Sequence, residues 1–191
     1  SELIVGCKKR FDNLIEIFIK VQDFPGLFYK LTKILEHSGL EIIDANIFTS
    51  NNKSFAANTF ISKYSHHDRP FNVSELNELA LRIENNFKRF DKITNLDKQA
   101  KKKSNFIKVV NISDFINKEK KRNLITIETV DSQGLLANIA KVFFENKVSI
   151  HSARINTLGE RVEDTFEIEN FNKIGSFDHP TFNFDTNIGG Y

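Results

Sequence analysis

Apolar and polar positions alternate along residues 14–21 and again along residues 123–130, as expected of strands with one buried face. Each run leads into a turn that contains glycine, and apolar residues then recur at the spacing of one helix face. These faces consist of Leu27, Leu31, Ile34 and Leu35 in the first case and of Leu135, Ile139, Val142 and Phe143 in the second. The pattern predicts a strand, a turn and a helix at two places in the chain.

The two places are copies of one sequence. Asp23 aligns with Asp131, 108 residues later, and the alignment needs no gap as far as Thr49 and Thr157. Identical pairs are Asp23/Asp131, Gly26/Gly134, Leu27/Leu135, Lys33/Lys141, Ile42/Ile150, Ala45/Ala153, Ile47/Ile155 and Thr49/Thr157. Residues 58–61 then match residues 164–167 after a shorter turn. A repeat of this length indicates a duplicated supersecondary unit.

The repeat divides the chain. We expect a tail of an upstream region at 1–13, a first domain at 14–115, an incomplete second domain at 122–169 and an irregular tail at 170–191. Predicted elements of the first domain are strands at 14–21, 41–49, 55–64 and 106–112, a helix at 27–37, and a second helix capped by Ser74. Predicted elements of the second domain are strands at 124–130, 149–157 and 161–169 and a helix at 135–146.

The second copy lacks the last helix and strand of the first. A three-stranded sheet covered by one helix leaves apolar surface and an open edge. We expect that edge to be covered by the first unit, by another chain, or by sequence outside these 191 residues.

Composition excludes several classes of protein. The chain has a net charge of +2, too close to neutral to indicate nucleic acid or an anionic membrane as the main partner. Its single cysteine, Cys7, excludes an internal disulfide scaffold, and no apolar run approaches the roughly 20 residues that span a bilayer. We therefore expect a cytoplasmic protein without a membrane partner. The absence of methionine indicates a piece of a longer chain.

The two glycine turns are the candidate binding elements. A glycine turn at a helix start exposes backbone N–H groups at the positive helix end, which suits a carboxylate. An acidic residue at the start of the turn, Asp23 or Asp131, can receive an ammonium group. A free amino acid needs both complements close together. The alternative is structural, in which glycine permits the turn and aspartate caps the helix.

A strand–helix–strand–strand–helix–strand order with antiparallel strands is an α+β, ferredoxin-like arrangement. The turn motif D-x-x-G-L-[LF], with small residues in the next strand, resembles the ACT domain, a small-molecule regulatory module. Residues 152–166 resemble the last ACT domain of the bifunctional uridylyltransferase/uridylyl-removing enzymes, and residues 44–50 with 58–61 resemble the penultimate one. The implied fold is two ferredoxin-like ACT domains, the second truncated at its C-terminal end.

The resemblance implies a function. Tandem ACT domains at the end of these enzymes bind glutamine and switch the enzyme between adding UMP to the PII nitrogen-signalling protein and removing it. The matching turn residues are Asp23, Pro25, Gly26 and Leu27, and Asp131, Gly134 and Leu135. The matching strand residues are Asp44, Ala45 and Asn46, and Ser152, Ala153 and Arg154. Gln133 departs from the pattern, which usually has proline there.

The resemblance also sets expectations for partners. The ligand would be glutamine or another small amino acid, and PII would be a partner through the parent enzyme. ACT domains would pair within one chain or between two. No cofactor is expected in this chain, and Mg²⁺ is implied only for catalytic domains that lie outside it. Whether the chain is an enzyme is left open, since it carries no recognisable catalytic site.

Two alternatives to a sensor within a larger enzyme remain. One is a stand-alone tandem ACT protein that binds an amino acid or mediates dimerisation. The other is an enzyme that uses His66, His67 and Asp68 with a metal. The His-Asp dipeptide lies in an expected loop without the further ligands that such a metal site needs, so we predict no metal. Arg161, Glu163 and Asp164 are interpreted as exposed ion pairs on a sheet edge.

Overall fold

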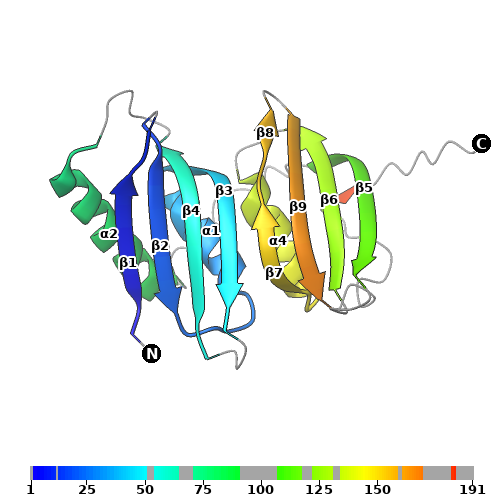
Figure 1. The fold of residues 1–191 in the computed structure, drawn as a ribbon, viewed down its shortest axis with the longest axis horizontal. Helices are drawn as coiled ribbons and strands as arrows, with labels where there is room; N and C mark the ends of the chain where they lie inside the picture. The colour runs from blue at the N-terminus through cyan, green and yellow to red at the C-terminus, as the bar shows by residue number, and fades with distance from the viewer. Residues whose placement is uncertain are drawn as a thin grey trace, which may run out of the picture.

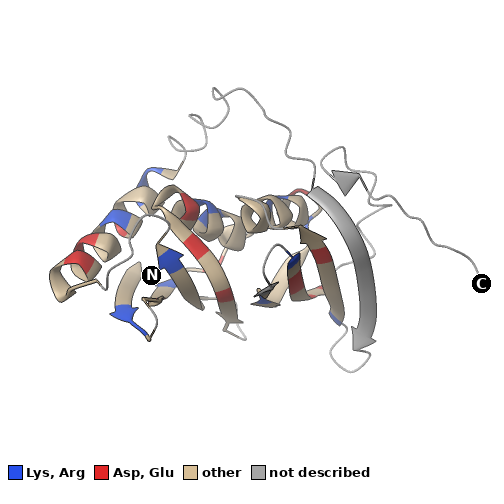
Figure 2. Ribbon diagram, turned by 90° about the horizontal axis from the view of Figure 1, so that it is seen from above, with Lys and Arg blue, Asp and Glu red and all other residues tan. Residues whose placement is uncertain are grey.

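Two sheets lie side by side with their helices on the same face (Figures 1 and 2). The computed structural model describes residues 2–11, 13–50, 54–64, 71–90, 107–117, 122–130, 134–158, 161–169 and 182–183. In chain order the elements are β1 (Ile4–Lys9), β2 (Ile15–Val21), α1 (Leu27–His37), β3 (Leu40–Thr49), β4 (Ala56–Tyr64), α2 (Val73–Lys88), β5 (Ile107–Asn117), β6 (Arg122–Val130), α4 (Leu135–Glu145), β7 (Ser149–Arg154), β8 (Thr157–Leu158), β9 (Arg161–Glu169) and β10 (Phe182–Asn183).

The first sheet has the strand order β1-β2-β4-β3, and all of its strand pairs are antiparallel. Every second residue of β2 faces the helices: Ile15, Ile17 and Ile19 are at most 1% exposed. Leu31, Ile34 and Leu35 of α1 are fully buried against this face. The predicted helix at 27–37 is confirmed, because the apolar stripe read from the sequence is the face that packs on the sheet.

The cap of α2 differs from the prediction. Asn72, and not Ser74, caps this helix: its Oδ1 accepts a hydrogen bond from the Glu75 N–H at 2.9 Å. The Glu75 carboxylate in turn accepts the Asn72 N–H at 2.9 Å, which completes a capping box. The sequence contains the two residues of this box three positions apart. Ser74 was the wrong choice because it lies inside the first turn.

The first sheet takes its outer strand from the start of the chain. Residues 4–9, expected to belong to a tail, form β1 and pair with β2 from Ile4–Lys20 to Lys9–Ile15. The strand predicted at 106–112 as the last strand of the first unit is β5, and it pairs with β6 in the second sheet. The two sheets therefore do not follow the predicted division at 14–115 and 122–169.

The placement of β1 in the first sheet and of β5 in the second has one physical cause. β1 is joined to β2, and β5 to β6, by a short connection, and consecutive strands joined in this way pair as hairpins. β1 and β5 are equivalent strands, because residues 112–117 of β5 lie 108 residues after Ile4–Lys9. The repeat therefore extends upstream of Asp23. Each copy is thus a strand followed by the predicted β–α–β–β order, and its sheet has the strand order of a ferredoxin-like fold.

The second sheet runs β10-β5-β6-β9-β7, with β8 paired to β9. It is antiparallel except that the two-residue strand β10 runs parallel to β5. β10 lies within the segment 170–191 that was expected to be irregular, and the rest of that segment is outside the described residues. Where the first unit has α1 and α2, the described part of the second has only α4. The missing fourth strand is replaced by β5.

The cores of the two units are built alike. Phe60 of β4 and Phe166 of β9 occupy the same place in the repeat, and both are fully buried. Phe60 stacks with Phe28 at a ring-centroid distance of 6.4 Å, and Phe166 meets Phe143 edge-on at 5.2 Å. Each central strand is therefore fixed to its helix by an aromatic pair.

The units meet along α1 with α4 and β3 with β7. β3 and β7 are edge strands of separate sheets and adjoin without a ladder between them (Figure 1). The equivalent helices run in opposite directions, so the start of each lies beside the end of the other. Across the part of the chain that is described, no helix has the length and apolar character needed to cross a membrane.

Candidate functional site

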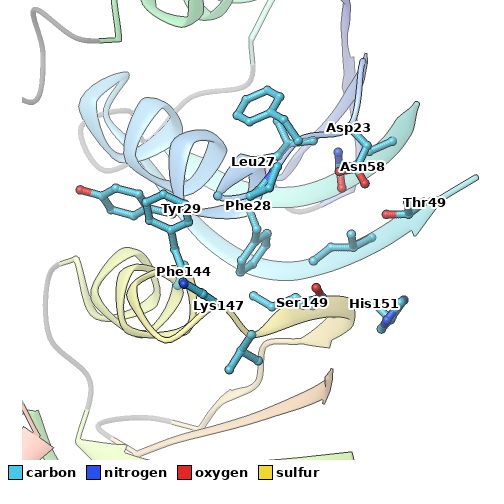
Figure 3. A pocket seen from close by; sticks show the side chains of 18 of the residues that line it. Asp23, Leu27, Phe28, Tyr29, Thr49, Asn58, Phe144, Lys147, Ser149 and His151 are labelled. Carbon is cyan, nitrogen blue, oxygen red and sulfur yellow. The ribbon is translucent and has the colours of Figure 1, made fainter. Parts of the chain in front are cut away.

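A cavity of about 790 Å³ lies where α1 begins, and both units line it (Figure 3). The first unit contributes the turn from Asp23 through Tyr29, together with Ile47, Thr49, Ala56 and Asn58. The second contributes Ala140, Phe144, Glu145 and residues 147–151. The cavity therefore exists only because the start of α1 faces the end of α4 and the start of β7.

The Gly26 turn forms one wall. Gly26 has φ +84°, a left-handed conformation that glycine adopts without strain, and it is the N-cap of α1. No side chain caps this helix and its first turn holds no acidic residue. The Leu27 N–H closes the turn by donating to the Phe24 carbonyl at 3.1 Å. The remaining N–H groups of a first turn have no partner within the helix, so this end of α1 can receive an anion.

Phe144 of α4 forms the facing wall. A Cβ built on Gly26 would come within 2.7 Å of the Phe144 ring, so no other residue fits there without movement. The ring is held by Tyr29, which stacks with it at a centroid distance of 6.3 Å and an interplanar angle of 14°. An aromatic surface thus lies directly beside the N-terminal end of α1.

Polar groups enter the cavity from both units. Asn58 is 1% exposed, and its Nδ2 has no hydrogen-bond partner among the described residues. Asp23 and Thr49 lie on the same side of the cavity as Asn58 (Figure 3). Lys147, Ser149 and His151 lie across from them on the second unit. His151 Nε2 is 3.0 Å from Glu169 Oε2, which fixes the ring at the cavity edge.

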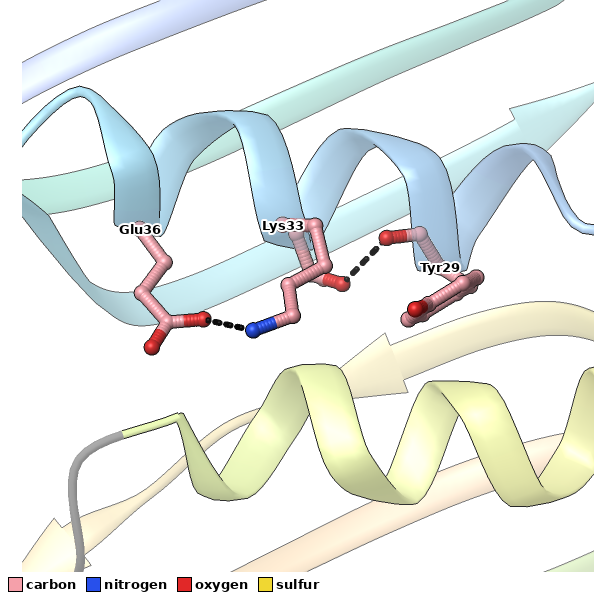
Figure 4. A network of polar contacts seen from close by, with 4 residues as sticks. Tyr29, Lys33 and Glu36 are labelled. Carbon is pink, nitrogen blue, oxygen red and sulfur yellow. Dashed lines mark hydrogen bonds and ion pairs between the residues drawn. The ribbon is translucent and has the colours of Figure 1, made fainter. Parts of the chain in front are cut away.

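The second glycine turn has a different neighbour. Gly134 is the N-cap of α4 with φ +77°, again without a side-chain cap. A Cβ built on Gly134 would meet Glu36 Oε1 at 2.7 Å. Glu36 also accepts a hydrogen bond from Lys33 Nζ at 3.1 Å, and Figure 4 shows its carboxylate directed towards the start of α4. A carboxylate of the chain itself therefore lies where α4 begins.

The predicted site residues fall into three groups. Asp23, Pro25, Gly26 and Leu27 line the cavity together. Asp44, Ala45 and Asn46 of β3, and Ser152, Ala153 and Arg154 of β7, do not line it: both alanines are buried, Asp44, Asn46 and Arg154 are exposed, and Ser152 is half-buried. Gly134 and Leu135 begin α4, while Asp131 lies outside the described residues. A ligand-binding role for any of these residues stays a prediction.

Sequence reasoning did not select the residues that the second unit adds. Phe144, Lys147 and Ser149 lie far from the Gly26 turn in sequence and reach it only through the packing of the units. A signal was nevertheless present. Phe144 and Glu36 are 108 residues apart, so each occupies the same place in its copy and each faces the glycine of the other copy.

Two further expectations can be compared with the structure. His66, His67 and Asp68 lie outside the described residues, and within the described ranges no three His, Cys, Asp or Glu side chains gather closely enough to hold a metal. Arg161 forms an ion pair with Glu128, as expected of an exposed strand residue. Asp164, however, is 1% exposed, so its interpretation as an exposed edge residue was wrong: it points to the helix face of β9.

Comparison with known proteins finds relatives that carry the name bifunctional uridylyltransferase/uridylyl-removing enzyme. The chain is 30% identical over 157 residues to the bifunctional uridylyltransferase/uridylyl-removing enzyme of Psychrobacter sp. (strain PRwf-1), a match that covers 82% of this chain and 17% of that enzyme. It is 31% identical over 172 residues to the enzyme of the same name from Acinetobacter baylyi, covering 86% of this chain and 19% of the enzyme. No family model matches the chain.

A comparison with solved structures matches an aspartate kinase from Synechocystis, with a TM-score of 0.45 and 14% identity over 82% of this chain and 24% of that one. A likeness at this level says nothing about function. The chain spans less than a fifth of the length of the curated relatives named above. The resemblance inferred from the sequence is thus confirmed: over about four-fifths of its length, this chain is similar to a segment of the bifunctional uridylyltransferase/uridylyl-removing enzymes.

Proposed function

We propose that the chain is an amino-acid-sensing regulatory region, with glutamine as its ligand, of a bifunctional uridylyltransferase/uridylyl-removing enzyme. The observation that carries this proposal is the cavity at the Gly26 turn, which both units line. Its volume of about 790 Å³ falls within the range of about 300–1,000 Å³ that is typical of small-molecule sites.

The cavity offers complements to both ends of an amino acid. The first turn of α1, with no side-chain cap and no acidic residue, suits the α-carboxylate. The Asp23 carboxylate lines the same cavity and suits the ammonium group. Apolar surface from Leu27, Ile47 and Phe144 suits the methylene groups of a side chain. A zwitterion with a side chain of a few carbons matches this combination better than a purely anionic ligand.

Regulation follows from the shared walls. A ligand in the cavity contacts the first unit through the Gly26 turn and the second through residues 147–151. Its affinity therefore depends on how the units are placed, and it favours the placement that it binds best. In the parent enzyme that preference would bias the adding and removing activities. PII as the protein substrate, Mg²⁺ in the catalytic domains and a cytoplasmic location belong to the same proposal.

Calorimetry on the 191-residue chain tests the proposal. Glutamine is expected to bind at up to millimolar concentration with about one site per chain. Asp23→Asn keeps the shape of the side chain and removes its charge, so it is expected to weaken binding by about tenfold or more, since the proposed ion pair with the ligand ammonium would be lost. Asp44→Asn is the matched control, because Asp44 is exposed outside the cavity.

Two outcomes would contradict the proposal. One is the absence of any glutamine binding to the unaltered chain. The other is a loss of binding in Asp44→Asn equal to that in Asp23→Asn, which would place the ligand elsewhere. In the full enzyme, an unchanged ratio of uridylyl transfer to removal with saturating glutamine would leave binding intact but would refute the switching role.

A further inference from the structure

Asn58 is a buried polar side chain whose donor is not used by the fold. It lies in β4 between Ile19 of β2 and Ile47 of β3, on the face that carries Ala56 and Phe60. It is 1% exposed, and Nδ2 has no hydrogen-bond partner among the described residues. Burying an amide without a hydrogen bond is unfavourable, and the side chains of Ile19, Ile47, Ala56 and Phe60 offer it no partner. An apolar side chain would therefore serve the core better at this position.

The same side chain lines the cavity at the Gly26 turn. Figure 3 shows it close to Asp23, to one side of the start of α1, with Thr49 further along the same side. The amide thus lies at the inner wall of the cavity, within the group of polar side chains that the first unit supplies.

The second copy provides an internal comparison. Asp164 of β9 occupies the place of Asn58 in the repeat and is buried to the same extent, at 1% exposed. Its Oδ1 accepts the backbone N–H of Asn156 at 3.3 Å, so this position holds the connection between β7 and β8 in place. The Asn58 Nδ2, by contrast, has no hydrogen-bond partner among the described residues. The position is structural in the second unit, and in the first unit its side chain lines the cavity.

We propose that the Asn58 carboxamide donates a hydrogen bond from Nδ2 to the side-chain carbonyl oxygen of the bound amino acid. This inference rests on the proposed function and adds the group that selects the ligand. A site built to hydrogen-bond a ligand group discriminates against an analogue that lacks it, because the buried donor is then left unpaired. The site therefore prefers an amino acid with a carboxamide side chain to an apolar one of the same length.

The test compares glutamine with methionine, which has an unbranched side chain of similar length without a carbonyl oxygen. Calorimetry on the unaltered 191-residue chain is expected to show glutamine binding at least about tenfold more tightly than methionine. Asn58→Leu removes the amide at similar volume, and the ratio of the two affinities is expected to fall towards one. Asn58→Asp replaces the donor by an acceptor and is expected to weaken glutamine binding while methionine binding changes less.

Urea unfolding without ligand distinguishes a role of Asn58 in ligand selection from a role in the stability of the fold. If the Asn58 amide serves the ligand, Asn58→Leu has a midpoint of urea unfolding equal to or higher than that of the unaltered chain. A lower midpoint with an unchanged glutamine-to-methionine ratio would show that Asn58 supports the fold alone and would overturn the inference. Equal affinity of the unaltered chain for both amino acids would overturn it too, while leaving the proposed function standing. Binding of neither would overturn both.

Discussion

The Glu36 carboxylate lies against Gly134, so that a Cβ on this glycine would meet Oε1 at 2.7 Å. The same place in the other copy is occupied by Phe144, whose ring a Cβ on Gly26 would also meet at 2.7 Å. Two glycines with the same left-handed conformation therefore face different chemistry. A carboxylate at the start of α4 already meets the positive helix end, whereas the start of α1 is faced by a ring. For this reason the proposed binding site is the first turn and not the second.

Substituting Gly26 by alanine is expected to destabilise the chain by about 2–5 kcal/mol. A left-handed backbone costs a residue with a Cβ about 1–2 kcal/mol, and overlap with a packed side chain adds about 1–3 kcal/mol. Gly39→Ala is the matched control, since Gly39 has φ +81° but its Cβ would lie 3.4 Å from Tyr64, an ordinary contact. Urea unfolding measures both. Equal losses in the two variants would contradict a clash with Phe144.

Gly134→Ala is expected to cost less than Gly26→Ala. The atom that its Cβ would meet is the end of a flexible glutamate side chain, which can turn away, while the Phe144 ring is held by Tyr29. The loss in unfolding free energy should be about that of Gly39→Ala, 1–2 kcal/mol. Adding Glu36→Ala to Gly134→Ala should relieve little further strain. A large rescue by Glu36→Ala would show instead that the carboxylate is rigidly held.

Replacing Asn72 by alanine removes the capping box of α2 and is expected to reduce the unfolding free energy by about 1 kcal/mol. Ser74→Ala removes an exposed hydroxyl from the first turn and is expected to change it by less than about 0.5 kcal/mol. Chemical denaturation of the two variants measures the difference. The reverse order would restore Ser74 as the cap.

The burial of Cys7 leads us to expect that the unfolding free energy depends on pH in the alkaline range. Burial raises the pKa of the Cys7 thiol from 9.0 to about 11, an effect that Arg82 partly opposes. Above pH 9 the unfolded chain loses this proton more readily than the folded chain, so folding stability from this group is full below pH 9 and is lost as pH rises towards 11. The unfolding free energy of the unaltered chain should therefore fall more steeply between pH 9 and 11 than that of Cys7→Ser. Parallel pH profiles would show that burial does not hold the proton on Cys7.

The elements that local pattern determines were predicted well. Helix α1 has the predicted bounds because its apolar stripe, the turn before it and the glycine after it all lie within one short segment. The sheet to which each strand belongs could not be predicted from local pattern. β1 is short and mixed, with Gly6 and two lysines, and β5 could pair with either unit on its pattern alone. Only the short connection between β5 and β6 assigns β5 to the second sheet.

One wall of the candidate site could be predicted from local sequence, and the opposite wall could not. The Gly26 turn carries its own signature, and the sequence places Asp23 and Leu27 beside it. The opposite wall depends on α1 and α4 packing with opposite directions, which no single segment specifies. Asn58 was visible only as one member of an aligned pair with Asp164. Its significance required its burial and its unused donor, both of which depend on the tertiary structure.

The upstream extension of the repeat has a consequence for assembly of the chain during synthesis. Because β1 pairs with β2 and β5 with β6, each sheet starts from a hairpin of neighbouring strands, and closing such a short loop is fast. The first sheet and both of its helices are complete once Lys88 has left the ribosome, before α4 and β7 of the second copy have emerged. The cavity needs α4 and β7, so we expect it to form only after both copies have been made and have packed together.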